Sequence, residues 1–226
     1  MEFFIDDQEI EDQFQNIFKK IQILRNGETH QEMKNLGLTY QKSVGAGIVN
    51  LREIAADYTP NHLLAHKLWA KGFRETKILA TLLEESNLVN TQQLDRWLKE
   101  MDFNELLEQA SMNLFVNLSD VEDLGKDWIQ SKNRKKELCA IMLSGRLAMR
   151  KDNQYDSYLE QFVDILPQNI EDSYYRNQLA RCLGKIVRRN NKLAEKISKL
   201  VLHLKSKDKN WLEIWENLQY ELELRG

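Results

Sequence analysis

Two glutamates in the stretch DRWLKEMDFNELLEQASMNLF (95–115) are the first side chains whose spacing could do chemistry. Glu105 and Glu108 are three residues apart, and such residues lie on neighbouring faces of a helix because 3.6 residues make one turn. Paired carboxylates can act as general acid and base, while a single carboxylate can stabilise a cation that develops during bond cleavage. The spacing alone leaves three interpretations open: a working pair, the remains of one, or a solvated helix face.

His62 and His66 are four residues apart, a spacing that lets two imidazoles of one helix bind a metal ion. No third ligand of a suitable kind is evident nearby in the sequence, so we expect no metal ion. VGAGIV (44–49) contains a lone GxG without a third glycine or a preceding strand. It therefore indicates a turn between helices and no dinucleotide site. No cofactor is expected.

The basic residues are unevenly distributed along the chain. The formal net charge is −3, but residues 134–209 hold 17 Lys or Arg against 9 Asp or Glu, a net of +8. A basic region on an acidic chain can present a positive face to phosphate, although ordinary solvated helix faces would explain it as well. If the region binds DNA, the expected contacts are Arg134, Lys135, Arg176, Arg181, Lys185, Arg188 and Arg189.

The elements that must position these side chains are expected to be helices. Gly (9) and Pro (2) are scarce, and apolar residues recur at helical spacing, as in Phe14, Ile17, Phe18 and Ile21. The fold class is therefore all-α. The expected helices are 6–25, 28–36, 47–57, 60–71, 74–86, 91–101, 103–117, 120–132, 134–151, 153–166, 171–190, 191–204 and 208–224.

The boundaries of these helices indicate a repeat. Pro60 and Pro167 suit helix ends, and Thr91 and Asp120 are expected N-caps. From residue 60 on, the helices pair off at a spacing of roughly 30–40 residues, which is typical of an α-solenoid of the HEAT or armadillo kind. No Gly/Ser linker divides the chain, so we expect a single domain over residues 1–226.

The expected compartment is the cytoplasm. No run approaches the roughly 20 apolar residues that a membrane-spanning helix needs. The stretch MEFFIDDQEIEDQF at the start lacks the basic and apolar regions of a signal peptide. Cys139 and Cys182 are the two cysteines, and we expect both to be reduced and buried. No membrane contact is expected.

Several blocks of the sequence resemble the DNA alkylation repair enzyme family of HEAT-like, all-helical alkylpurine DNA glycosylases. The blocks are MKNLGLTYQKSVGAGIVNLREIAADY (33–58), LLAHKLWAKGFRETKILATLL (63–83) and LDRWLKEMDFNELLEQASMNLF (94–115), with IVRRNNKLAEKI and SKDKNWLEIWENLQYELE further on. The resemblance covers roughly residues 30–224. It implies a right-handed superhelix of helix pairs whose concave, basic surface holds double-stranded DNA. It also implies cleavage of the N-glycosidic bond of cationic alkylated purines.

The same resemblance assigns the candidate site residues and shows where this chain departs from the family. Glu108 stands where the family has its catalytic aspartate, and Asn104 stands four residues earlier, where the family has a tryptophan. Leu138 stands where the family has an arginine, on an apolar stripe that indicates core. Arg181 or Lys185 stands where the family has a later tryptophan. Since a catalytic constellation tolerates displacements of only about 0.5 Å, these changes put the activity in doubt.

Three functions remain open on this basis. Glu105 is expected to face solvent, which leaves Glu108 as the one candidate catalytic carboxylate. The first function is a DNA-binding protein of this family with weak glycosylase activity or none. The second is a protein-binding solenoid without a role on DNA, and the third is an active DNA N-glycosylase that uses Glu108.

Overall fold

The structure is a computed structural model that describes residues 7–224. All regular secondary structure in that range is helical, which confirms the expected all-α fold. Many helices have an Asn or Asp at the N-cap, and its side chain accepts a hydrogen bond from a backbone amide of the first turn. This satisfies an amide donor that the helix itself leaves unpaired. These capping residues are Asp7, Asn26, Asn61, Asn90, Asn133, Asp172 and Asn190.

The chain divides into two compact units, Met1–Ser119 and Asp120–Gly226, and each is described by itself. The helices of the N-terminal unit are α1 (Gln8–Ile23), α2 (Gly27–Asn35), α3 (Ile48–Ala56), α4 (His62–Lys71), α5 (Arg74–Leu83), α6 (Thr91–Lys99), α7 (Asn104–Asn113) and the 3-10 helix η1 (Phe115–Asn117). Those of the C-terminal unit are α8 (Val121–Ile129), α9 (Arg134–Leu147), α10 (Asp156–Asp164), α11 (Ser173–Val187), α12 (Asn191–Lys205) and α13 (Asn210–Glu223). The expectation of a single domain stays a prediction.

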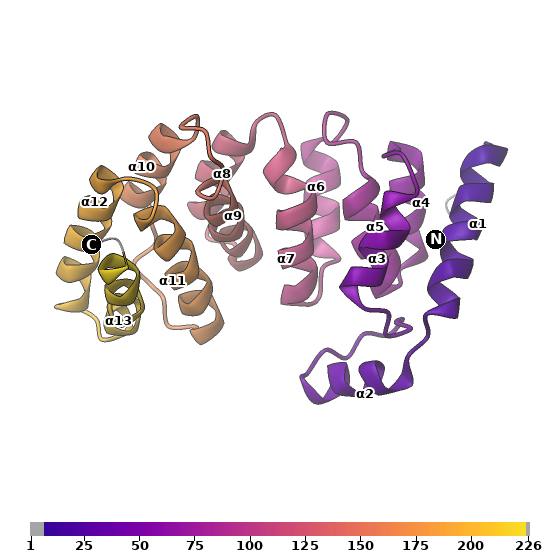
Figure 1. Cartoon of the computed structure of the whole chain (residues 1–226), viewed down its shortest axis with the longest axis horizontal. Coiled ribbons are helices and arrows are strands. Elements are labelled where there is room, and N and C mark those ends of the chain that lie inside the picture. The colour runs from indigo at the N-terminus through magenta and orange to yellow at the C-terminus, as the bar shows by residue number, and fades with distance from the viewer. Residues whose placement is uncertain (1–6, 225–226) are drawn as a thin grey trace. The chain divides into compact units, whose positions relative to one another are not determined.

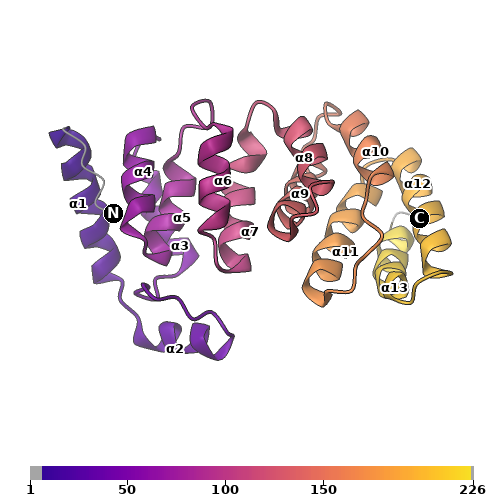
Figure 2. The same cartoon turned by 180° about the vertical axis from the view of Figure 1, so that it is seen from behind.

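In the N-terminal unit, α5 is the central helix. It packs against α4, α3 and α7, and α4 in turn packs against α1 (Figures 1 and 2). The side chains between α4 and α5 are fully buried, among them Leu64, Leu68, Ile78 and Leu79. Helix α2 projects from the end of α1, and the segment that follows it returns the chain to α3 (Figure 1). Residues at the start of α5 can therefore reach several elements at once.

In the C-terminal unit, α11 occupies the central place. It packs against α9, α12 and α13, while α8 packs against α9 (Figure 1). The contact of α9 with α11 is close because Gly145 has no side chain: a Cβ atom there would lie 3.4 Å from the Cα atom of Cys182. Ile141, Leu143 and Leu183 are fully buried in this core. The close approach brings side chains at the edges of the two helices together.

Each expected helix is present and in the expected order, although residue 6 of the first lies outside the described residues. Of the two expected N-caps, Thr91 is wrong, while Asp120 stands at the N-cap position of α8 as expected. Asn90 caps α6 through the amide of Gln93, and Thr91 is the first residue inside the helix. Asp120 precedes α8 but makes no capping hydrogen bond through its side chain.

Candidate nucleic-acid interface

The two predicted catalytic positions lie on α7 of the N-terminal unit. Asn104 is the first residue of the helix and is exposed, and Glu108 lies one turn further on and is half-buried. The amide of Asn104 provides no aromatic surface on which a base could stack. Asn104 therefore cannot do the work of the family's tryptophan, and catalysis by Glu108 stays a prediction.

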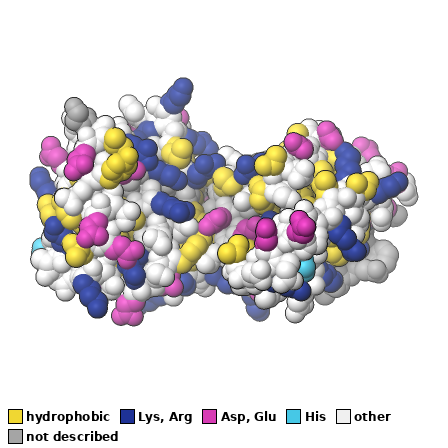
Figure 3. Space-filling view, turned by 60° about the horizontal axis from the view of Figure 1, so that its bottom comes forward, with side chains coloured by type: hydrophobic (Ala, Val, Ile, Leu, Met, Phe, Trp, Pro, Cys, Tyr) yellow, Lys and Arg dark blue, Asp and Glu magenta, His cyan; other side chains and the backbone are white. Residues whose placement is uncertain are grey.

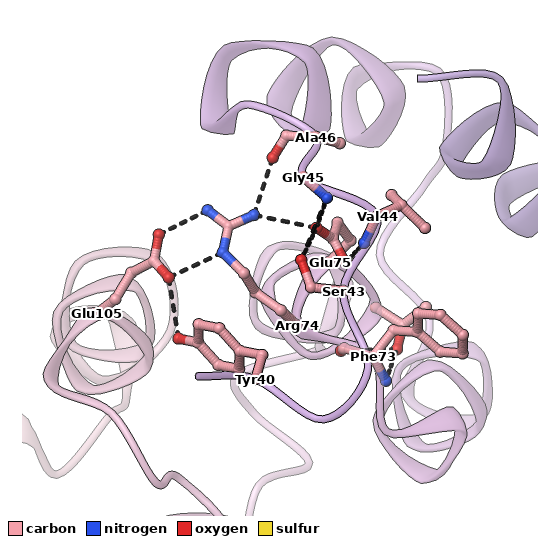
Figure 4. A network of polar contacts seen from close by, with 10 residues as sticks. Tyr40, Ser43, Val44, Gly45, Ala46, Phe73, Arg74, Glu75 and Glu105 are labelled. Carbon is pink, nitrogen blue, oxygen red and sulfur yellow. Dashed lines mark hydrogen bonds and ion pairs between the residues drawn. The ribbon is translucent and has the colours of Figure 1, made fainter. Parts of the chain in front are cut away.

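Glu105, on the neighbouring face of α7, is bound within the protein. Arg74 donates to both of its carboxylate oxygens, with Nε 2.8 Å from Oε2 and Nη2 2.6 Å from Oε1 (Figure 4). The Tyr40 hydroxyl donates to Oε2 over 2.9 Å. A two-pronged arginine–carboxylate pair of this kind is among the strongest polar contacts in proteins. The expectation that Glu105 faces solvent is wrong because α5 packs on α7 and places Arg74 opposite it.

Arg74 joins α7 to the segment that enters α3. Its guanidinium group donates to the carbonyl of Ala46 over 2.8 Å and lies 3.3 Å from a carboxylate oxygen of Glu75. The side chain of Arg74 is 2% exposed and that of Glu75 is 0% exposed. One buried arginine thus neutralises two carboxylates, Glu75 and Glu105.

The VGAGIV segment (44–49) forms the turn before α3 and wraps the Glu75 carboxylate. The Ser43 hydroxyl and the Gly45 amide donate to one carboxylate oxygen over 2.8 and 3.1 Å. Gly45 has a φ of +79°, and a Cβ atom there would meet the carbonyl oxygen of Asn26 at 2.3 Å, so only glycine fits. The predicted turn is confirmed, and the amide of Gly45 donates to the buried Glu75 carboxylate.

The Arg74–Glu105 pair predicts a stability that depends on pH. Burial raises the pKa of Glu105, but the hydrogen bond and charge of Arg74 outweigh burial, and the pKa ends below its ordinary value of 4.5. A carboxyl whose pKa is lowered by folding stabilises the protein above its unfolded pKa, and this contribution is lost as the pH falls through the folded pKa. The free energy of unfolding of the parent should therefore exceed that of Glu105→Gln at pH 6 and converge on it below pH ~4. Urea titrations at both pH values measure this, and an equal difference at both would contradict it.

Leu138, which stands where the family has an arginine, lies on α9 in the C-terminal unit. It is 4% exposed and belongs to the core, as its apolar stripe predicts. A buried leucine can neither bind a phosphate nor support a cationic transition state, since both tasks need a charged or hydrogen-bonding group. The chemistry that the family places at this position is absent here.

Two of the predicted DNA contacts are engaged inside the C-terminal unit. Arg189, whose side chain is 7% exposed, pairs with Asp156 over 2.6 Å and donates to the carbonyls of Arg150 and Asp152. Arg176 pairs with Glu213 over 2.8 Å and also donates to backbone carbonyls. Because their guanidinium groups are occupied, both residues hold loops and helices together.

Arg134 and Lys135 begin α9. The Arg134 guanidinium lies 3.4 Å from the centre of the Tyr175 ring and 3.5 Å from carboxylate oxygens of both Glu137 and Asp172. Lys135 is half-buried within the first turn. The charge of Arg134 is thus balanced by two acids, and whether either residue contacts DNA stays a prediction.

The remaining predicted contacts form a cluster. Arg181, Lys185 and Arg188 follow the spacing i, i+4, i+7 along one face of α11, and Arg146 joins them from α9. We call these four residues the α9–α11 basic cluster. Burial lowers the pKa of Lys185, and the charges of Arg146, Arg181 and Arg188 lower it further. The like charges gathered around Lys185 provide a favourable place for an anion.

Arg146 and Arg181 carry the most available charge of this cluster. Both are exposed, and neither makes an ion pair within residues 7–224, while Arg188 pairs with Glu221 over 3.1 Å. In Figure 3, Lys and Arg side chains gather over the C-terminal unit, near where Figure 1 places α9 and α11. The sequence prediction missed Arg146 because its neighbours in the cluster are more than 30 residues away in the chain.

A polar groove of about 520 Å³ lies beside the basic cluster, between α11 and α13. Arg181 lines it together with Asn177 and Asn217, and Tyr220, which is 65% exposed, forms part of its wall. Exposed aromatic rings and arginine planes are groups on which unpaired bases stack. Glu216 and Glu221 also line the groove, so these stacking groups lie beside two carboxylates.

The two histidines of α4 have a third potential ligand after all. Glu84, the residue at the end of α5, lies against them, and one of its carboxylate oxygens is 2.6 Å from Nδ1 of His62. The expectation that no such ligand is near is wrong because the α4–α5 hairpin brings the end of α5 back to the start of α4.

Cys139 and Cys182 are buried and do not form a disulfide, as expected. Burial raises the pKa of the Cys182 thiol to about 12, which makes it a poor nucleophile. Among the helices within residues 7–224, none combines the length and apolar character that crossing a membrane requires. The cytoplasmic location stays a prediction.

Comparison with known proteins places the chain in a family. The model of the DNA alkylation repair enzyme family matches residues 17–182, which is most of the chain. No curated protein matches it. A solved structure from "a new family of proteins related to the HEAT-like repeat DNA glycosylases with affinity for branched DNA structures" superposes with a TM-score of 0.70 at 18% identity, covering 84% of this chain and 83% of that one. That likeness shows a HEAT-like repeat fold, and with the family match we conclude that the chain belongs to the DNA alkylation repair enzyme family.

Proposed function

We propose that this protein binds DNA through the α9–α11 basic cluster and does not excise alkylated bases. The observation that carries the proposal is the gathering of Arg146, Arg181 and Arg188 around Lys185, where their like charges repel and where Arg146 and Arg181 are exposed. A DNA phosphate placed among them would relieve this repulsion and release counterions from the duplex. Contacts of this kind bind the DNA backbone, so they do not depend on the base sequence.

The case against base excision rests on the side chains at the family's functional positions. Asn104 provides no aromatic surface, and Leu138 is a buried core residue. Among these positions, Glu108 alone keeps the negative charge that could stabilise a cation during bond cleavage. Electrostatic stabilisation in an active site needs donors and charges placed in advance around the reacting atoms, and one carboxylate without its partners provides little of this.

The type of DNA is suggested by the structural neighbour. That protein comes from a family with affinity for branched DNA structures. Branched DNA combines a high density of phosphates with unpaired bases, and the groove beside the cluster provides Tyr220 and Arg181 as stacking surfaces for such bases. We therefore propose branched DNA as the preferred ligand of this chain.

A paired binding and activity assay tests the proposal. Fluorescence anisotropy on a four-way junction, a three-way junction and a linear duplex should give saturable binding at low salt, tightest for the junctions. A base-release assay on methylated DNA should give no release above that of buffer. Release that disappears in Glu108→Gln would instead establish an active glycosylase. If no DNA binds at 50 mM salt, the proposal is wrong and a protein-binding solenoid is the function to test next.

A further inference from the structure

A cluster of three potential metal ligands lies in the N-terminal unit, outside the basic cluster. His62 and His66 are four residues apart on α4, and Glu84 ends α5. The ligand atoms of the three side chains all lie within 4.8 Å of one another. Nδ1 of His62 is 2.6 Å from one oxygen of Glu84, and Nε2 of His66 is 3.9 Å from the other.

The fold holds the Glu84 carboxylate in place from several sides. The backbone amide of Glu85 donates to Oε1 over 3.0 Å, and the side-chain amide of Gln93 donates to Oε2 over 2.6 Å. Gln93 is itself 2% exposed, in the first turn of α6. Outer partners that orient a ligand in this way are a regular feature of metal sites.

The carboxylate is short of positive charge. The Glu84 side chain is 0% exposed, and among the described residues its charged partners are imidazoles, with no Lys or Arg paired to it. Burial raises its pKa, and the His62 hydrogen bond only partly offsets this effect. A buried carboxylate needs a cation to compensate the loss of hydration. The carboxylates around Arg74 have a permanent cation, whereas the partners of Glu84 are imidazoles, which are cations only when protonated.

We propose that His62, His66 and Glu84 form a binding site for a divalent transition-metal ion, with Zn²⁺ the best fit. Two imidazole nitrogens and one carboxylate oxygen are a ligand set that Zn²⁺ takes in proteins, and a water molecule completes four-coordination. Imidazole ligands disfavour Mg²⁺ and Ca²⁺, which prefer oxygen. The His62 side chain is 26% exposed and lies within reach of solvent, while Nε2 of His66 and the Glu84 carboxylate are buried.

Binding needs movements of several side chains. With metal–ligand bonds of about 2.0–2.1 Å, ligand atoms of a tetrahedral site lie about 3.3 Å apart. The 2.6 Å contact of His62 with Oε1 of Glu84 must open and the 3.9 Å separation of His66 from Oε2 must close, and the carboxylate must turn so that one oxygen faces both imidazoles. For Nε2 of His66 to bind the ion, Nδ1 must carry the ring proton, so Arg96, whose Nη2 lies 3.3 Å from Nδ1, must move away. The ligands of this site lie in the N-terminal unit and are not among the residues proposed to contact DNA.

Isothermal titration with Zn²⁺ and visible spectroscopy with Co²⁺ test the proposal on the full chain. We expect one ion per chain, and for Co²⁺ the intense visible bands of a tetrahedral site. Glu84→Gln keeps the size of the side chain and an acceptor for His62, and His62→Gln alters a partly exposed ligand. Each should weaken binding at least ~10-fold while circular dichroism shows a folded chain.

His203→Ala is the matched control, because His203 is an exposed histidine that stands alone on α12. It should leave the affinity and the Co²⁺ spectrum unchanged. The proposal is overturned if the parent binds no Zn²⁺ at 100 μM or gives an octahedral Co²⁺ spectrum. It is equally overturned if Glu84→Gln and His62→Gln, both folded, bind as the parent does.

Discussion

Arg74→Met is expected to lower the free energy of unfolding by about 3–5 kcal/mol, the largest effect of any single substitution proposed for this protein. Methionine keeps most of the volume of the side chain and removes its charge and donors. The substitution leaves the carboxylates of Glu75 and Glu105 without their cation, and the former is 0% exposed. It also leaves the carbonyl of Ala46 without its donor. Uncompensated buried charge, more than the lost contacts themselves, sets the size of the effect.

Urea unfolding followed by circular dichroism measures this effect, with Arg25→Met as the matched control. Arg25 is an exposed arginine of the same unit, and its replacement should change the free energy of unfolding by no more than about 0.5 kcal/mol. Adding Glu75→Gln and Glu105→Gln to Arg74→Met should restore part of the stability, because it removes the orphaned charges. If Arg74→Met lowers the free energy of unfolding by less than about 1 kcal/mol, the ion pairs of Arg74 contribute no more than ordinary surface ion pairs.

Arg181→Gln combined with Lys185→Gln is expected to weaken DNA binding at least ~10-fold at low salt and to reduce the slope of log K against log salt by about 2. The reason is that each cation that neutralises a phosphate releases counterions, so each lost contact removes close to one unit of slope. Because these contacts are to the backbone, the loss should be the same for junctions of different sequence. Fluorescence anisotropy across a series of salt concentrations measures both quantities.

Lys192→Gln combined with Lys199→Gln gives the matched control for this prediction. These lysines lie on α12 of the same unit with side chains 74% and 80% exposed, and the control changes the net charge by the same amount. It should leave both affinity and salt slope near those of the parent. If the control loses as much affinity as the α11 variant, the attraction comes from the total charge of the unit and the basic cluster is not the interface.

The sequence by itself determined the helices and the residues they bury. The spacing of apolar side chains placed each helix in order and assigned Leu138 to the core, and the scarcity of Gly and Pro excluded a turn-rich β fold. These predictions succeed because they depend on residues three or four positions apart, whose relation is set by the helix itself. The family was named from the resemblance of the quoted sequence blocks, and the match of the family model over residues 17–182 confirms it.

Tertiary structure alone decided which polar side chains meet. Glu105 is bound because α5 brings Arg74 to it, and Glu84 joins His62 and His66 because a hairpin returns the chain. Arg146 joins the basic cluster by the same kind of contact between helices.

Arg176 and Arg189 pair with acids far away in the sequence, and whether they contact DNA stays a prediction. A charged side chain on a helix can turn to solvent, to a partner helix or to DNA, and its local sequence is the same in each case. The choice depends on packing between elements more than 20 residues apart, and the spacing of residues within one helix does not encode it.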